Sequence, residues 1–223
     1  MYDDNLILKD GSVALDENDV AASAVTVNGD GNYVLDIKKT GNTGLYAVMV
    51  CPTAPTTYAD TLTAKIQASH HLTDGWEDIA AFPVLYALMR ELRCTPTTAF
   101  VSTDIGLVLT ATTDSASDAG VIIDFENKMI NNTLDEGRIL VQMSDANDDY
   151  STEGDTLTAT SGTGVGTQGV ASVLTTERSY GIFVIRFATD RRYIRSSTVV
   201  SSGGAWGLTE MYVTSSPPKV YRM

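Results

Sequence analysis

Cysteine and histidine are scarce in this sequence, with two of each among 223 residues. Cys51 and Cys94 cannot form a disulfide framework or a four-cysteine zinc site within one chain. We therefore expect two buried thiols, with a single disulfide as the alternative. His70 and His71 are adjacent at the end of a predicted strand, where neighbouring side chains point to opposite faces and cannot bind one metal ion together. The sequence predicts no metal site and no cofactor.

The motifs of common active sites are also missing. There is no Gly-x-Ser-x-Gly elbow, and the glycines of residues 161–169 are not followed by the Gly-Lys-Ser/Thr of a phosphate-binding loop. Residues 145–149 match the first ligand positions of an EF-hand loop, but Tyr150 replaces the required glycine and Thr156 the required glutamate. We therefore predict that the protein is not an enzyme. The acidic stretch is interpreted as a solvated loop, and the alternative is a loose cation site formed by Asp148, Asp149, Glu153 and Asp155.

Long hydrophobic runs and positive charges are few as well. The longest apolar run, Gly44–Val50, is far too short to cross a bilayer, and Met1–Asn5 lack the basic start of a secretory signal. Acidic residues outnumber basic ones by 28 to 15, which gives a formal net charge of −13 at pH 7. The field of such a chain repels nucleic acid. We predict neither a nucleic-acid partner nor a membrane.

The charge is unevenly distributed along the chain. Through Glu177 there are 8 basic and 26 acidic residues, whereas from Arg178 onward there are 7 basic and 2 acidic ones. We interpret the basic C-terminal segment as a surface for an acidic partner, including a neighbouring copy of the chain. The alternative is a set of ordinary ion pairs within the fold.

Alternation with a period of two is the dominant positive signal. In Thr61–Ser69, apolar residues face one way and polar residues the other, which predicts a half-buried strand. Gly181–Ile185 is apolar on both faces, as is typical of a central strand. Short strands of this kind, separated by Asn-Gly, Asp-Gly and Gly-Gly turns, predict a mostly β fold. The other predicted strands are Tyr33–Lys38, Leu45–Cys51, Leu107–Thr112, Val121–Phe125, Arg138–Met143, Leu157–Thr160, Tyr180–Phe187, Tyr193–Val200 and Leu208–Val213.

Three segments interrupt the series of strands. Pro83–Arg93 places several leucines on one helical face, and a short helix and a further strand are equal alternatives there. Asp145–Asp155 is acidic and Ser161–Gly169 is glycine-rich, and both are predicted to be exposed loops.

The candidate interface residues are arginines and tryptophans. Arg191, Arg192 and Arg195 open a late predicted strand. Arginine on the outward face of a strand pairs bidentately with carboxylates, which suits contacts between subunits. The alternative is that these arginines neutralise acidic neighbours of the same fold. Trp76 and Trp206 complete the set of candidates.

Four segments occur along the chain in an order that resembles that of a known protein family. They are Leu8–Leu15, Val34–Ile37, the predicted hairpin Leu62–Phe82 with Asp-Gly-Trp at its turn, and Arg191–Arg195. The order is similar to that in the capsid cement (decoration) proteins of tailed bacteriophages. The resemblance implies a β-sandwich of jelly-roll type and a virion structural protein on the outer capsid surface. It also implies two partners, the major capsid protein and further copies of the chain, most often in a homotrimer.

The resemblance covers residues 5–83 and 178–216. We therefore expect a jelly-roll β-sandwich formed by residues 1–83 and 178–223, with residues 84–177 as an insertion. The strand that carries Arg-Tyr-Ile-Arg also looks like discoidin-type, galactose-binding jelly rolls. A carbohydrate-binding module with Trp76, Trp206 and Tyr212 along a groove is thus the alternative function.

Overall fold

The computed structural model describes residues 7–11, 15, 33–38, 44–53, 58–112, 119–145, 148, 150–174, 180–201 and 206–215. These residues are mostly in antiparallel β-strands, as expected, and the only helical segment among them is a single 3₁₀ turn, Ser102–Asp104. The chain divides into two compact units. Unit 1 comprises Met1–Pro55, Asp60–Leu85 and Thr176–Met223, and unit 2 comprises Thr56–Ala59 and Tyr86–Thr175.

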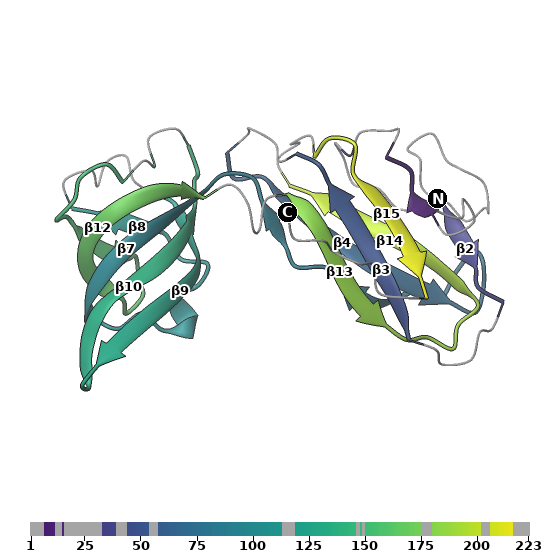
Figure 1. Ribbon diagram of the computed structural model, residues 1–223, viewed down its shortest axis with the longest axis horizontal. Helices are drawn as coiled ribbons and strands as arrows, with labels where there is room; N and C mark the ends of the chain where they lie inside the picture. Colours follow the sequence, from purple (N-terminus) through teal and green to yellow (C-terminus); the bar gives the residue numbers. More distant parts are fainter. Residues whose placement is uncertain are drawn as a thin grey trace. The chain divides into compact units, whose positions relative to one another are not determined.

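Unit 1 contains two antiparallel sheets (Figure 1). The Ser196 hydroxyl of one sheet donates a hydrogen bond to the Leu8 carbonyl of the other, at 3.4 Å. The first sheet has the order β1 (Ile7–Lys9), β15 (Glu210–Thr214), β3 (Leu45–Cys51) and β13 (Gly181–Phe187). The second has the order β2 (Val34–Asp36), β14 (Tyr193–Val200), β4 (Thr61–Ser69) and β5 (Glu77–Ala81), and β6 (Leu85–Tyr86) also pairs with β4.

The predicted alternation in β4 is confirmed. The side chains of Leu62, Ala64, Ile66 and Ala68 are buried, whereas Thr61, Thr63, Lys65 and Gln67 are partly exposed. Burial of one face sets the register of a strand, because a slip by one residue would move all four apolar side chains into water. This strand therefore fixes the position of β14, which pairs with it from Tyr193 to Val200.

The prediction of a central strand at residues 181–185 is wrong. Among the described strands, β13 pairs with β3 alone and lies at the edge of the first sheet. Its outward residues Ile182 and Val184 are 57% and 37% exposed. Apolar side chains on both faces of a strand therefore do not show whether both of its backbone edges are paired.

The helical alternative for Pro83–Arg93 is also wrong. Residues of this stretch form β6 and the start of β7 (Met89–Thr98), which lies between β12 and β10 in the sheet of unit 2. Leu92 and Cys94 are buried one after the other along one face of β7. Pairing on both edges of a central strand outweighs the helical preference of its leucine.

The sheet of unit 2 closes on itself. Its order is β8 (Leu109–Ala111), β11 (Thr156–Ala159), β12 (Val165–Leu174), β7, β10 (Thr133–Gln142) and β9 (Val121–Ile130). A bridge between Val108 and Val121 joins the two ends of this order, and the Leu109 amide donates to the Gly120 carbonyl at 2.8 Å. The six strands thus form a small cylinder around one core (Figure 1).

The prediction of an exposed glycine-rich loop at residues 161–169 is wrong in its second half, because β12 begins at Val165. Gly164 and Gly166 are buried and lie against side chains of the core. A Cβ atom on Gly164 would lie 2.1 Å from the Phe100 ring, and one on Gly166 would lie 2.3 Å from the Cys94 sulfur. Glycine is therefore needed here for close approach inside a narrow cylinder, and not for flexibility.

We expect Gly164→Ala to lower the free energy of unfolding of unit 2 by about 1–3 kcal/mol, because the added methyl group overpacks against the Phe100 ring. Combining it with Phe100→Leu, which removes part of the ring, should cost less than the sum of the two single changes. Both tryptophans lie in unit 1. Urea unfolding followed by circular dichroism should therefore show the loss, while the transition in tryptophan fluorescence stays in place. Strictly additive effects, or a shift in fluorescence alone, would contradict the explanation.

Candidate functional site

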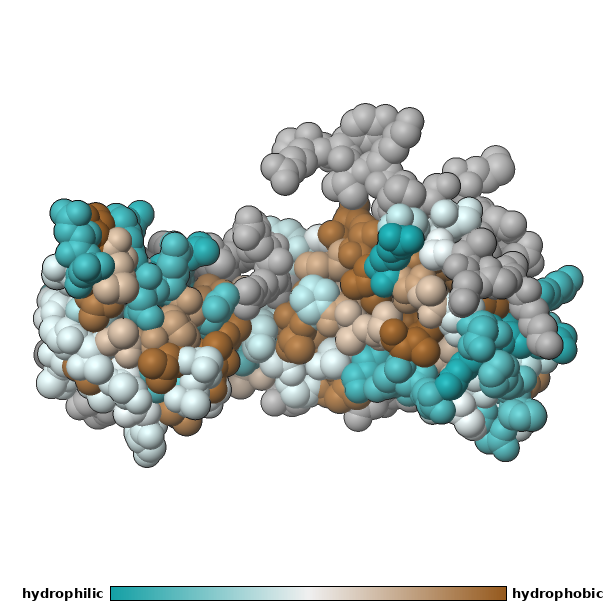
Figure 2. Space-filling view, turned by 90° about the horizontal axis from the view of Figure 1, so that it is seen from below, coloured by the Kyte–Doolittle hydropathy of each residue, from teal (hydrophilic) through white to brown (hydrophobic). Residues whose placement is uncertain are grey.

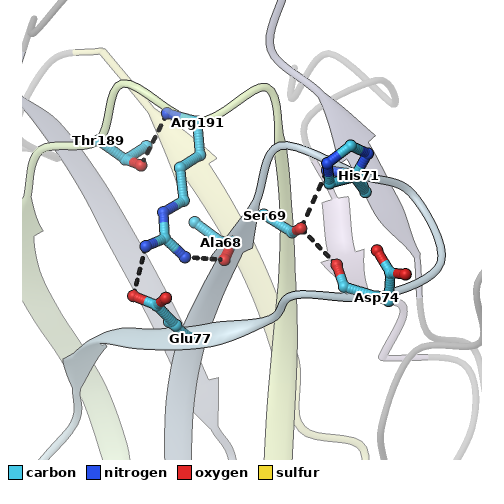
Figure 3. A network of polar contacts seen from close by, with 7 residues as sticks. All are labelled: Ala68, Ser69, His71, Asp74, Glu77, Thr189 and Arg191. Atoms are coloured by element: carbon cyan, nitrogen blue, oxygen red, sulfur yellow. Dashed lines mark hydrogen bonds and ion pairs between the residues drawn. The ribbon is translucent and has the colours of Figure 1, made fainter.

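The three predicted arginines lie at the start of β14, and Arg191 connects three segments of unit 1. Its guanidinium donates to the Ala68 carbonyl at 2.9 Å and forms an ion pair with Glu77, while its backbone amide donates to the Thr189 hydroxyl (Figure 3). Ala68 belongs to β4 and Glu77 to β5. Arg191 therefore ties the β4–β5 hairpin to the segment that leads into β14.

The turn of this hairpin is held by Ser69. Its hydroxyl donates to the Asp74 carbonyl and accepts a hydrogen bond from the His71 amide at 3.0 Å (Figure 3). Gly75 has a φ of +66°, a conformation that favours glycine. His70 and His71 are exposed on this turn.

Arg192 forms a two-pronged ion pair with Asp36 of β2. Its Nε lies 3.0 and 3.1 Å from the two carboxylate oxygens, and one of its terminal nitrogens lies 2.7 Å from Oδ2. This hydrogen bonding holds the pKa of Asp36 below its usual value and raises the pKa of Arg192. The guanidinium also lies 5.0 Å from the centre of the Tyr193 ring. The pair fastens β2, a strand of three residues, to the longer β14.

Arg195 lies in a row of polar side chains on the outward face of the second sheet. Its Nε donates to Gln67 Oε1 at 2.9 Å, and its guanidinium stacks 4.2 Å from the centre of the Trp76 ring. Gln67 Nε2 in turn donates to Asp78 at 2.9 Å, and Asp78 forms an ion pair with Lys65 at 2.6 Å. Burial lowers the pKa of Arg195. The row crosses β5, β4 and β14.

All the contacts named here for the three arginines lie within unit 1. The alternative interpretation, neutralisation of acidic neighbours in the same fold, describes Arg191 with Glu77 and Arg192 with Asp36. A role of these residues between subunits stays a prediction.

The inclusion of Trp206 among the interface candidates is wrong. Its side chain is completely buried in unit 1, and that of Tyr212 is nearly so. The third aromatic residue proposed for a sugar-binding groove, Trp76, is partly covered by Arg195. The aromatic side chains that were expected to line a groove therefore do not form an exposed platform. The sequence offers no local signal for the burial of Trp206, because Ser202-Gly203-Gly204 before it are typical of an exposed turn, and this predicted turn lies outside the described residues.

The two cysteines are buried and free, so the prediction of two thiols is confirmed. They lie in different units, and burial raises the pKa of Cys94 to about 12. A thiol of this kind packs as a small apolar side chain and does not react as a nucleophile.

The acidic segment 145–155 is not simply a solvated loop. Asp148 is buried, and its carboxylate accepts hydrogen bonds from the backbone amides of Ala119, at 2.6 Å, and of Ser144 and Asp145. Asp155 is buried too. Asp149, a further member of the alternative cation site, lies outside the described residues. Within the part of the chain that is described, no three His, Cys, Asp or Glu side chains are grouped so that they could hold a metal ion.

The surfaces that sequence reasoning missed are two groups of exposed apolar side chains. One lies at and just before the edge strand β13 in unit 1, and the other at the end of the β9–β10 hairpin in unit 2. Hydrophobic residues appear as brown areas among the teal ones on the molecular surface (Figure 2). The first group comprises Tyr180, Ile182 and Val184, and the second comprises Met129 and Ile130.

No protein family, curated protein or solved structure matches this chain in the comparisons. Over the described residues, the chain forms no helix of the length and hydrophobicity needed to cross a membrane.

We expect Arg191→Ala to destabilise unit 1 more than Arg192→Ala. The Arg191 side chain is 19% exposed and satisfies a backbone carbonyl, whereas that of Arg192 is 49% exposed. Loss of a partly buried, charge-assisted hydrogen bond costs about 1–3 kcal/mol, and an exposed ion pair contributes little. Urea unfolding followed by tryptophan fluorescence measures both. Equal losses, or a larger loss for Arg192→Ala, would contradict this ranking.

The contribution of Asp36 should depend on pH. Because its pKa is lowered in the folded state, the stability that it adds is present above the pKa of the unfolded chain, about 3.9. That stability is lost as the pH falls through the folded pKa. The difference in unfolding free energy between the wild type and Asp36→Asn should therefore shrink steadily below about pH 4. A difference that stays constant down to pH 2 would rule out the ion pair as its source.

Proposed function

We propose that unit 1 is a β-sandwich of jelly-roll type and that the chain is a capsid cement protein. The pairing of strands supports the fold. Counted along unit 1 without β6, the strands β1, β2, β3, β4, β5, β13, β14 and β15 are the first to the eighth. The first pairs with the eighth, the second with the seventh, the third with the sixth and the fourth with the fifth. A long antiparallel hairpin wound into two sheets has this pairing, and it is the pattern of an eight-stranded jelly roll.

This pairing is the observation that carries the proposal, because it agrees with the fold that the resemblance to phage decoration proteins implies. The segments that carry the resemblance include β4 with the β4–β5 turn, and the start of β14. The long segment of unit 2, Tyr86–Thr175, enters between the fifth and sixth strands of this count. The jelly-roll order of unit 1 is thus continuous on either side of the insertion.

In this role the protein acts by adhesion. Each copy buries exposed apolar side chains against the major capsid protein and against other copies on the outer surface of the head. An interface of about 1,600 Å² in total is of the usual size for a stable contact. Repetition over the shell makes many such contacts act together, so that modest affinity at each site reinforces the junctions between capsomers.

Purified virions test the proposal directly. Mass spectrometry should detect the chain in them, and a membrane-impermeant amine reagent applied to intact virions should label its lysines, because the protein lies outside the shell. Heads that lack the protein should release DNA at a lower temperature, and adding the purified chain should restore the wild-type temperature. Absence of the chain from virions, or labelling only after the heads are opened, would sink the proposal.

A further inference from the structure

The β9–β10 hairpin of unit 2 extends beyond the packed part of its sheet. From Glu126 to the turn and back to Glu136, no described side chain is buried, and the turn is the lowest point of unit 2 in Figure 1. Near the turn, Met129 is 60% exposed and Ile130 is 48% exposed. Leu134 is paired directly opposite Met129 and is partly exposed. The end of the hairpin therefore presents apolar side chains to solvent.

The hairpin is held in a defined shape. Asn131 and Asn132 have φ values of +50° and +63°, as in the tight two-residue turn that suits the twist of a hairpin. Lys128 lies 3.4 Å from Asp135 on the opposite strand. At the base, the side chain of Asn127 exchanges two hydrogen bonds with the backbone of Phe100, at 2.7 and 3.2 Å. A preorganised apolar tip loses little conformational entropy when it binds.

The group at β13 in unit 1 is a suitable receptor surface. Ile182 and Val184 alternate outward along an edge strand, Tyr180 precedes them and Arg186 follows them, and all four are exposed. Natural proteins usually protect such an edge with charges or bulges, or they cover it with another segment. The register between β13 and β3 is continuous from Gly181 to Phe187, without a bulge.

The two groups lie in segments of opposite net charge, although unit 1 as a whole is also acidic, with 11 basic and 15 acidic residues. Residues 86–175 contain 4 basic and 13 acidic residues, whereas residues 176–223 contain 7 basic and 3 acidic ones. Three of the four basic residues in unit 2 (Arg93, Lys128 and Arg138) pair with carboxylates of the same unit. Arg191 and Arg192 are likewise paired within unit 1, but β13 itself carries the exposed Arg186 and no acidic residue. The acidic unit 2 is therefore attracted to the positive charge at β13 more strongly than to another unit 2.

We propose that the β9–β10 tip of one copy binds the β13 strip of a second copy, in a head-to-tail contact. The tip is Met129 and Ile130, and the strip is Tyr180, Ile182 and Val184. A closed trimer needs a contact of this type, because a ring of three requires two different, complementary surfaces on every subunit. The inference rests on the self-association in the proposed function, and it names the surfaces that meet.

The test uses the full chain in two variants and their mixture. Met129→Lys/Ile130→Lys removes the tip, and Ile182→Lys/Val184→Lys removes the strip. In sedimentation velocity the wild type should form trimers, and each variant alone should be monomeric, with association weakened at least 100-fold. An equimolar mixture should give a one-to-one dimer, because one variant keeps an intact strip and the other an intact tip. High salt should weaken the association of the wild type.

The matched controls are Val199→Lys and Leu208→Lys, which change residues that are 51% and 54% exposed elsewhere in unit 1. They should leave the trimer intact, and circular dichroism should show that all variants are folded. A tip variant that associates like the wild type would overturn the inference, as would a mixture that stays monomeric. A wild type that is monomeric would also overturn the inference, and this includes a monomer whose tip binds phosphatidylcholine vesicles.

The outcome is separable from the proposed function. A monomeric protein that is present on virions would remove the inference and leave the cement role in place. If the protein associates head to tail through the tip and the strip but is absent from virions, the inference holds and the cement role is removed.

Discussion

Backbone pairing between residues 45–69 and residues 181–214 is the constraint on which the rest of the structure depends. Through it β3 binds β13 and β15, and β4 binds β14, although the partners are more than a hundred residues apart. The intervening chain must therefore leave unit 1 and return to it. Within unit 2, Met89 pairs with Leu174, so the first and last strands of the insertion lie side by side. An insertion whose ends meet adds a second core without disturbing the first.

Local patterns predicted the strands whose two faces differ. β4 has one buried apolar face and one polar face, so its alternation shows both the strand and its inward residues. β4 and β14 both have the predicted bounds, but β14 buries Ser196 and Thr198 and exposes Val199, so its sequence does not show which residues face inward. β13 was recognised as a strand but misplaced in its sheet, because pairing depends on which distant segment arrives beside it. For the same reason, the sequence of Pro83–Arg93, which includes the start of β7, allows either a helix or a strand. The leucines of Pro83–Arg93 have helical spacing, and the two neighbours of β7 in the sheet of unit 2 decide in favour of a strand.

The residue types of the site could be predicted from the sequence, but their ion-pair partners could not. Arginines at the start of β14 were expected to meet carboxylates, yet Asp36 and Glu77 are brought to them by the register of β14 between β2 and β4. Glycine was misleading in the opposite way. A run with many glycines is read as a flexible loop, whereas Gly164 and Gly166 mark places where a Cβ atom would collide with the core of unit 2.

The two units treat their strand edges differently, and the tip and the strip lie at different places relative to those edges. The strands described in unit 2 close into a ring, so no edge of that sheet is left, and the exposed Met129 and Ile130 lie at the end of a hairpin that extends past the ring. Unit 1 stays open, and its apolar group lies along an edge strand. Identical patches favour a symmetric dimer, whereas two unlike, complementary patches favour a directional contact. A directional contact that closes into a ring covers every edge of this kind, and covering them keeps an exposed β edge from recruiting further strands.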